Sequence, residues 1–193
     1  MKTDDGPMRR QVYGFEDAKI YYALANMDKD EPIGMSSLSR KTGIDLVSVR
    51  RMAPLLKECG LIESSKKGMT ISEKGCGLLR NIPIELTDIG RSEYAVGEHQ
   101  RGVIVRGAAR KITSGSRQRD IGIMTGADGA SVFAIMYGAL LMPRSWNMDL
   151  REPDLADDIR SRGMGEGDVM VVCGANDPNV AAMSAISAAL DLL

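Results

Sequence analysis

Arginine and lysine side chains gather in three short stretches of this 193-residue sequence, and these residue types are suited to binding an anion. The first stretch holds Arg50 and Arg51, and the second holds Lys66 and Lys67. The third stretch, residues 101–119, carries six basic residues and no acidic one. Guanidinium groups form paired hydrogen bonds with phosphates and carboxylates. Because the net charge of the chain is only −1, these stretches indicate an anionic partner for particular faces of the protein.

The residues that usually carry metal binding or catalysis are few. The single His99 cannot form a multi-histidine metal site, and its polar neighbours favour an ordinary surface residue over a general base. Cys59, Cys76 and Cys173 are odd in number and lack a short pairing motif, so we expect buried, reduced thiols. The glycine-rich run 163–167 precedes a predicted strand instead of following one, which excludes a dinucleotide-binding fingerprint. We therefore expect no metal, no cofactor and no enzymatic activity.

The arginine pair lies on a predicted helix at residues 46–59, with Asp45 as its N-cap and Gly60 just after its end. At about 100° per residue, one face of this helix is apolar. That face contains Val49, Met52, Ala53 and Leu56, and the opposite face contains Val47, Arg50, Arg51, Pro54 and Glu58. Pro54 removes one helical hydrogen bond, which is tolerable on an exposed face because water can satisfy the freed carbonyl.

Other elements surround this helix in a definite order. Two helices, from about residue 15 to 25 and from 36 to 42, precede it. Two short strands follow at 61–63 and 69–71, joined by a turn that carries Lys66 and Lys67, and Ser72 caps a fourth helix at 73–80. The runs 38–44, 49–51, 56–62 and 71–75 closely resemble winged-helix transcription regulators.

This resemblance implies binding to double-stranded DNA. The helix would enter the major groove while the hairpin contacts phosphates beside it. The residues implied for DNA binding are Val47, Ser48, Arg50, Arg51, Lys66 and Lys67. Winged helices also serve as protein-interaction modules, which is the alternative.

The second half of the chain has a different pattern, and we place the domain boundary between residues 91 and 92 because residues 82–92 lack a clear period. The predicted order is a strand, a helix, a hairpin, an acidic helix at 153–161, a buried strand at 168–173 and a final helix that begins at Pro178. The fold class is therefore mixed α/β (α+β overall), a winged helix-turn-helix followed by a small α/β sandwich. The final helix is apolar almost all round, as in a central helix or a shared dimer interface.

The whole chain resembles archaeal winged helix-turn-helix transcription regulators with a C-terminal α/β domain of unknown function. The matching C-terminal runs are 106–109, 118–120, 126–130 and 167–169, with Asp177 and Pro178. The resemblance implies DNA binding and effector sensing. We expect a homodimer whose C-terminal domain binds a small anionic metabolite through Arg106, Arg117 and Arg119. Alternatively, these arginines pair with Asp154, Asp157 and Asp158.

Two other functions fit the same sequence, namely a metabolite-modifying enzyme with an appended winged helix and a protein-binding winged helix. The sequence contains no apolar run near the roughly 18 residues that span a membrane, and it starts with polar residues that do not resemble a signal peptide. We therefore expect a cytoplasmic protein with no membrane partner.

Overall fold

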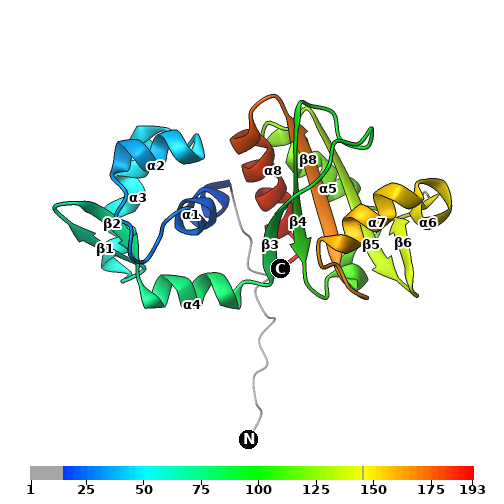
Figure 1. Cartoon of the computed structure of the whole chain (residues 1–193), viewed down its shortest axis with the longest axis horizontal. Helices are drawn as coiled ribbons and strands as arrows, with labels where there is room; N and C mark the ends of the chain where they lie inside the picture. Colours follow the sequence, from blue (N-terminus) through cyan, green and yellow to red (C-terminus); the bar gives the residue numbers. More distant parts are fainter. Residues whose placement is uncertain (1–14, 145) are drawn as a thin grey trace, which may run out of the picture.

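The computed structural model describes residues 15–144 and 146–193. The chain forms two units that lie side by side (Figure 1). We call residues 15–81 the N-terminal unit and residues 84–193 the C-terminal unit. The elements of the N-terminal unit are α1 (Phe15–Ala25), α2 (Met35–Thr42), α3 (Leu46–Glu58), β1 (Ile62–Ser65), β2 (Gly68–Ile71) and α4 (Glu73–Asn81).

The elements of the N-terminal unit form because each can bury one apolar face. On α3, the four apolar residues that the helical spacing predicts to face inward are at most 7% exposed. They join Leu24 of α1 and Leu38 of α2 in one hydrophobic cluster, to which the hairpin adds Ile62, Met69 and Ile71. Burial of these aliphatic side chains holds the three helices and the hairpin together.

An antiparallel six-stranded sheet forms the centre of the C-terminal unit, with the strand order β3-β4-β8-β5-β6-β7. All seven residues of β8 are buried, which fits its place inside the sheet. The strands are β3 (Ile84–Asp88), β4 (His99–Val105), β5 (Gly129–Met136), β6 (Ala139–Met142), β7 (Trp146–Asn147) and β8 (Val169–Ala175).

Helices cover both faces of this sheet. Because side chains alternate along a strand, Val169 and Val171 of β8 join the cluster that contains α8, while Met170 and Val172 join a second cluster with α6 and α7. Helix α5 packs on the same face as α8. The bounds are α5 (Ser116–Met124), α6 (Met148–Arg151), α7 (Pro153–Ser161) and α8 (Pro178–Leu190), and a short 3₁₀ helix, η1, covers Ala109–Lys111.

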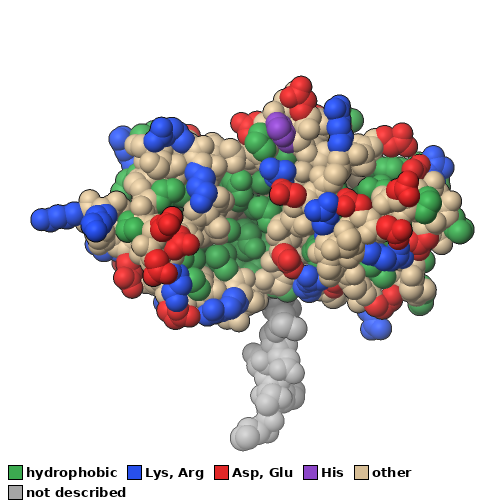
Figure 2. All heavy atoms as spheres, viewed as in Figure 1, with side chains coloured by type: hydrophobic (Ala, Val, Ile, Leu, Met, Phe, Trp, Pro, Cys, Tyr) green, Lys and Arg blue, Asp and Glu red, His purple; other side chains and the backbone are tan. Residues whose placement is uncertain are grey.

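The two units meet where α1 packs against α8. The Tyr22 hydroxyl donates a hydrogen bond to the Asn179 Oδ1 atom over 2.8 Å, and the Tyr21 hydroxyl donates one to the Ile84 carbonyl over 3.2 Å. The buried residues of the N-terminal unit and those around α8 form one continuous cluster. Beside this junction, apolar side chains of α1, α4 and α8 line a hollow that shows as hydrophobic surface between the units (Figure 2).

The mixed α/β fold class is confirmed, but the structure differs from the sequence prediction in three places. Residues 84–88 form β3 and pair with β4, although their sequence shows no clear helical or strand periodicity. The sheet of the C-terminal unit therefore begins before residue 91. The domain boundary between residues 91 and 92 stays a prediction. The short elements β7 and α6 were not predicted. Residues 181–190 of α8 are all buried within one chain, so the interpretation of this helix as a dimer interface is wrong.

Candidate nucleic-acid interface

Helix α3 has a buried face and an exposed face, and its basic residues lie on the exposed one. Arg50 and Arg51 are exposed, and the Val47 side chain beside them is 64% exposed. Ser48 lies on the same first turn and is half-buried. Neither the Arg50 nor the Arg51 side chain forms a hydrogen bond or ion pair with another residue among those the structure describes. Their guanidinium groups are therefore available to a ligand in solvent.

The start of α3 is fixed by local hydrogen bonds. The Asp45 carboxylate accepts a hydrogen bond from the Ser48 backbone amide over 2.8 Å, which caps the helix as predicted. Hydrogen bonds from Ser48 hold the pKa of Asp45 below its usual range, so the cap stays ionised. Before it, Gly43 takes a left-handed conformation with φ of 68°, and the Ser39 hydroxyl donates to the Ile44 carbonyl. This tight turn sets the angle between α2 and α3.

Pro54 lies inside α3, yet the helix continues to Glu58. Its side chain is exposed, as predicted, so the carbonyl that loses its partner is on the solvent side of the helix. The arginine pair precedes this position by about one turn. The regular first half of α3 is therefore the part that presents Val47, Arg50 and Arg51.

The hairpin places two more cations at its tip. Lys66 and Lys67 are exposed between β1 and β2, and their ammonium groups form no hydrogen bond or ion pair with other described residues. Close to this tip, β2 is anchored to the segment before α2, since Ile33 and Met69 exchange two backbone hydrogen bonds of 2.8 and 2.9 Å. A lysine or arginine side chain extends from this end of the molecule in Figure 2.

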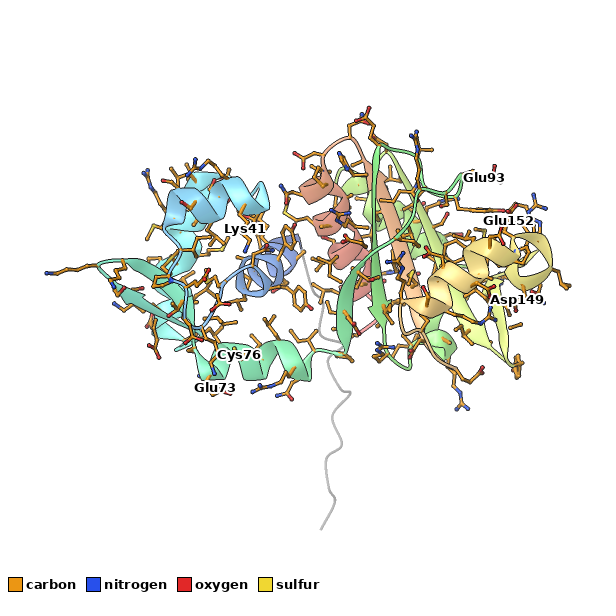
Figure 3. The ribbon with its side chains drawn as sticks, viewed as in Figure 1. Lys41, Glu73, Cys76, Glu93, Asp149 and Glu152 are labelled. Carbon is orange, nitrogen blue, oxygen red and sulfur yellow. The ribbon has the colours of Figure 1, made fainter. Side chains whose placement is uncertain are left out.

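An acidic residue of the N-terminal unit is held apart from these cations. Glu73, at the start of α4, pairs with Lys29 and with Arg80, and these hydrogen bonds hold its pKa below the usual range. Figure 3 shows Glu73 on the α4 side of the unit, away from Lys41 of α2. Within the described part of the chain, Arg50, Arg51, Lys66 and Lys67 form no ion pair with Glu73 or with any other acidic residue.

Two of the three arginines predicted to bind an effector have partners inside the protein. Arg106 donates a 2.8 Å hydrogen bond to the Asp168 carboxylate and another to Glu85. Arg117 forms a paired interaction with Asp191, with two contacts of 2.6 Å. The assignment of effector binding to Arg106, Arg117 and Arg119 stays a prediction. The alternative pairing with Asp154, Asp157 and Asp158 is wrong for Arg106 and Arg117, because their partners are Asp168, Glu85 and Asp191.

Arg119 is placed differently from the other two. It pairs with its neighbour Asp120 over 3.1 Å, and both side chains are more than half exposed. It lines a cavity whose lining residues include Arg144 but neither Arg106 nor Arg117. Sequence reasoning missed Arg144, because a single arginine after Pro143 in a loop gives no local signal.

The remaining candidates for chemistry are isolated. Among residues 15–144 and 146–193, no group of three or more His, Cys, Asp or Glu side chains could hold a metal ion. Burial raises the pKa of the Cys173 thiol to about 12, so it is not a reactive thiolate at neutral pH. Cys59, in contrast to the expectation of burial, is exposed. No helix in the described ranges is long and apolar enough to cross a membrane.

Two family models match this chain, one in each unit. A family model described as the CggR N-terminal DNA binding domain matches residues 18–85, which includes α3 and the hairpin. An N-terminal DNA-binding domain of this kind suggests a transcription regulator. The model for a domain of unknown function, DUF4443, matches residues 96–192, half of the chain, and the chain belongs to this family.

One solved structure has a similar fold over nearly the whole chain. It is the hypothetical protein PH0730 from Pyrococcus horikoshii OT3, with 22% sequence identity and a TM-score of 0.70. The alignment covers 93% of this chain and 92% of that chain, so the similarity in fold extends over both units. No curated protein matched the sequence.

Proposed function

We propose that this protein is a transcription regulator that binds double-stranded DNA through a winged helix-turn-helix in its N-terminal unit. The observation that carries the proposal is the set of exposed cations on α3 and the hairpin tip, which lack partners in the described chain and lie in a unit that matches a DNA-binding family model. These cations are the side chains that would release counterions from phosphates.

Each element has its own part in the proposed complex. Helix α3 enters the major groove, where Arg50 and Arg51 contact guanine edges and Val47 and Ser48 contact neighbouring bases or methyl groups. The hairpin lies beside the groove, and Lys66 and Lys67 contact phosphates. The buried face of α3 stays packed on α2 and β1 during binding, so the unit docks as a rigid body.

We further propose that the protein acts as a homodimer and that the C-terminal unit senses a small anionic metabolite. One winged helix covers too few base pairs for high specificity, and a dimer would read two half-sites. The contact between α1 and α8 supports sensing, because a change in the C-terminal unit would reach the turn before α3. The proposed role is binding and not catalysis.

The test is fluorescence anisotropy with genomic DNA fragments at several salt concentrations. Replacing Arg50 and Arg51 with Ala should weaken specific binding by about 1–3 kcal/mol for each base contact that the substitution removes. Replacing Lys66 and Lys67 with Ala should weaken binding to all sequences and reduce the salt slope by about 1 for each phosphate contact that is removed.

Arg110→Ala is the matched control. Arg110 is an exposed cation of the C-terminal unit whose side chain has no hydrogen-bond or ion-pair partner in the described chain. Its replacement removes one positive charge, as does the replacement of each single cation of α3 or the hairpin. The control should bind DNA as the unchanged protein does. If the α3 and hairpin variants also bound every duplex like the unchanged protein, the N-terminal unit would instead be a protein-interaction module.

A further inference from the structure

A cavity of about 240 Å³ lies in the C-terminal unit between the start of α5, strand β5 and the end of β6. Figure 1 places these elements in the C-terminal unit, away from α3. The polar wall of the cavity contains three serine hydroxyls and two arginines, and its apolar wall contains alanine, valine, methionine and proline side chains. The lining residues are Ser114, Gly115, Ser116, Arg119, Ala130, Ser131, Val132, Met142, Pro143 and Arg144.

The charge of this cavity is wholly positive. Arg119 and Arg144 line it, and none of its lining residues is acidic. Arg144 is exposed, and its side chain forms no hydrogen bond or ion pair with another described residue. Arg119 contacts Asp120, but an ion pair with both side chains in solvent contributes little and exchanges readily with another anion. Two guanidinium groups from different elements are thus available to the same space.

This arrangement differs from that of Arg106 and Arg117 in the same unit. Arg117 is held by Asp191, whose side chain is only 15% exposed, and Arg106 is held by the buried Asp168. In both pairs the arginine side chain is partly exposed, and the carboxylate that it contacts is largely buried. Arg119 and Arg144 have no such buried carboxylate partner among the described residues, so their guanidinium groups remain available to a ligand in the cavity.

The charge and lining of the cavity favour a phosphate monoester over a carboxylate. A phosphate monoester carries a charge of about −1.5 to −2 at neutral pH, which matches two arginines without an acid, whereas a carboxylate carries a single negative charge. The Ser114 and Ser116 hydroxyls are 3.0 Å apart and can turn toward phosphate oxygens. Val132, Met142 and Pro143 offer an apolar surface to a short carbon skeleton.

We propose that this cavity binds the phosphate group of a small phosphorylated metabolite through Arg119 and Arg144. The inference deepens the proposed function, because it rests on the sensing role and gives it a site and a ligand class. It retains Arg119 from the sequence prediction and replaces Arg106 and Arg117 with Arg144. Bidentate guanidinium contacts to the same phosphate group are the expected mode of recognition.

The test uses the full chain and isothermal titration with inorganic phosphate, with acetate at equal ionic strength as the second probe. We expect phosphate to bind and acetate to bind at least about tenfold more weakly. The double variant with Arg119→Gln and Arg144→Gln should weaken phosphate binding at least about tenfold. Arg144→Gln alone, at an exposed position, should also weaken it and serves if the double variant fails to fold.

Two controls separate this site from the DNA-binding surface. Arg110→Gln should leave phosphate binding unchanged. The variant with Arg50→Gln and Arg51→Gln should lose DNA binding and keep phosphate binding. Equal binding of acetate and phosphate, or unchanged phosphate binding in the cavity variants, would overturn the proposed site. Loss of DNA binding in the α3 variant together with no phosphate binding by the unchanged protein would reject the cavity alone and leave the DNA-binding proposal standing.

Discussion

At the scale of single residues, the basic side chains of this protein fall into two groups. Arg106 and Arg117 pair with carboxylates that are largely buried in the C-terminal unit. Arg50 and Arg51 have no such partner in the described chain and extend into solvent. A count of charges along the sequence does not separate the groups, since stretch 101–119 contains arginines of both kinds. The available cations, rather than the densest run of cations, define the candidate binding surfaces.

Asp168, the partner of Arg106, allows the contribution of these arginine–carboxylate pairs to stability to be tested. Burial raises the pKa of its carboxyl group, but hydrogen bonds from the Gly107 and Gly165 amides and from Arg106 outweigh burial and leave the pKa below its usual value. A lowered folded-state pKa stabilises the protein above the unfolded-state pKa of about 3.9, and this stability is lost as the pH falls further. Asp168→Asn should therefore lower the free energy of unfolding at pH 7 by about 1.5–3 kcal/mol.

Urea unfolding at pH 7, 5 and 3 checks this prediction. The difference between Asp168→Asn and the unchanged protein should persist at pH 5 and shrink at pH 3. Asp120→Asn is the control, because that carboxylate pairs with Arg119 on the surface and should change stability little at any pH. A difference that stayed constant from pH 7 to pH 3 would show that the carboxylate charge of Asp168 is not what stabilises the fold.

At the scale of elements, the turn between α2 and α3 depends on a glycine for two reasons. Gly43 has a φ of 68°, a conformation that side chains with a Cβ atom rarely adopt. A Cβ atom at this position would also lie 2.9 Å from the Cβ atom of Asn179 at the start of α8. The turn that positions α3 is therefore packed directly against the C-terminal unit.

Gly43→Ala should lower both stability and DNA affinity. The left-handed conformation alone costs a residue with a Cβ atom about 1–2 kcal/mol, and the contact with Asn179 adds to this. Gly107→Ala is a matched control, because Gly107 has a φ of 66° and nothing within 4 Å of its hypothetical Cβ atom. Thermal unfolding and anisotropy should show a larger decrease for Gly43→Ala than for Gly107→Ala. Equal decreases in both would mean that the Asn179 contact contributes nothing.

Elements with a strong local pattern were predictable, and those that depend on distant partners were not. The spacing of Val49, Met52, Ala53 and Leu56 defines α3 without any tertiary information. Strand β3 lacks such a pattern after Pro83 and exists because it pairs with β4. In the same way, the exposed α3 arginines followed from helical spacing. The partners of Arg106 and Arg117, Asp168 and Asp191, are 62 and 74 residues away, and no local pattern indicates them.

At the scale of the whole molecule, the two units share one hydrophobic cluster through α1 and α8. We expect them to unfold together. Fluorescence of Trp146, the only tryptophan, reports on the C-terminal unit, and far-ultraviolet circular dichroism reports on all the helices. The two signals should give one coincident transition, and Ile186→Ala should lower the stability by about 2–5 kcal/mol in both. A separate transition of the helices would show that the units unfold independently.

The proposed assembly is also tested on the whole molecule. Light scattering should give a mass of twice 20.9 kDa, and footprinting should give paired half-sites about 34 Å apart or a multiple of that distance. Since α8 is buried, the two-fold contact must use another surface of the chain. A mass of one chain at all micromolar concentrations would contradict the homodimer and leave the fold unaffected.

The hydrogen bond between Tyr22 and Asn179 joins residues that are 157 positions apart. During synthesis the ribosome therefore releases α1, α2, α3 and the hairpin long before it has made the helix on which α1 rests. Domains generally fold from the N-terminus as they emerge, but here the nascent N-terminal unit would still lack one wall of its core. The maturation of DNA binding should accordingly follow translation of α8, so that an incomplete chain would not occupy an operator.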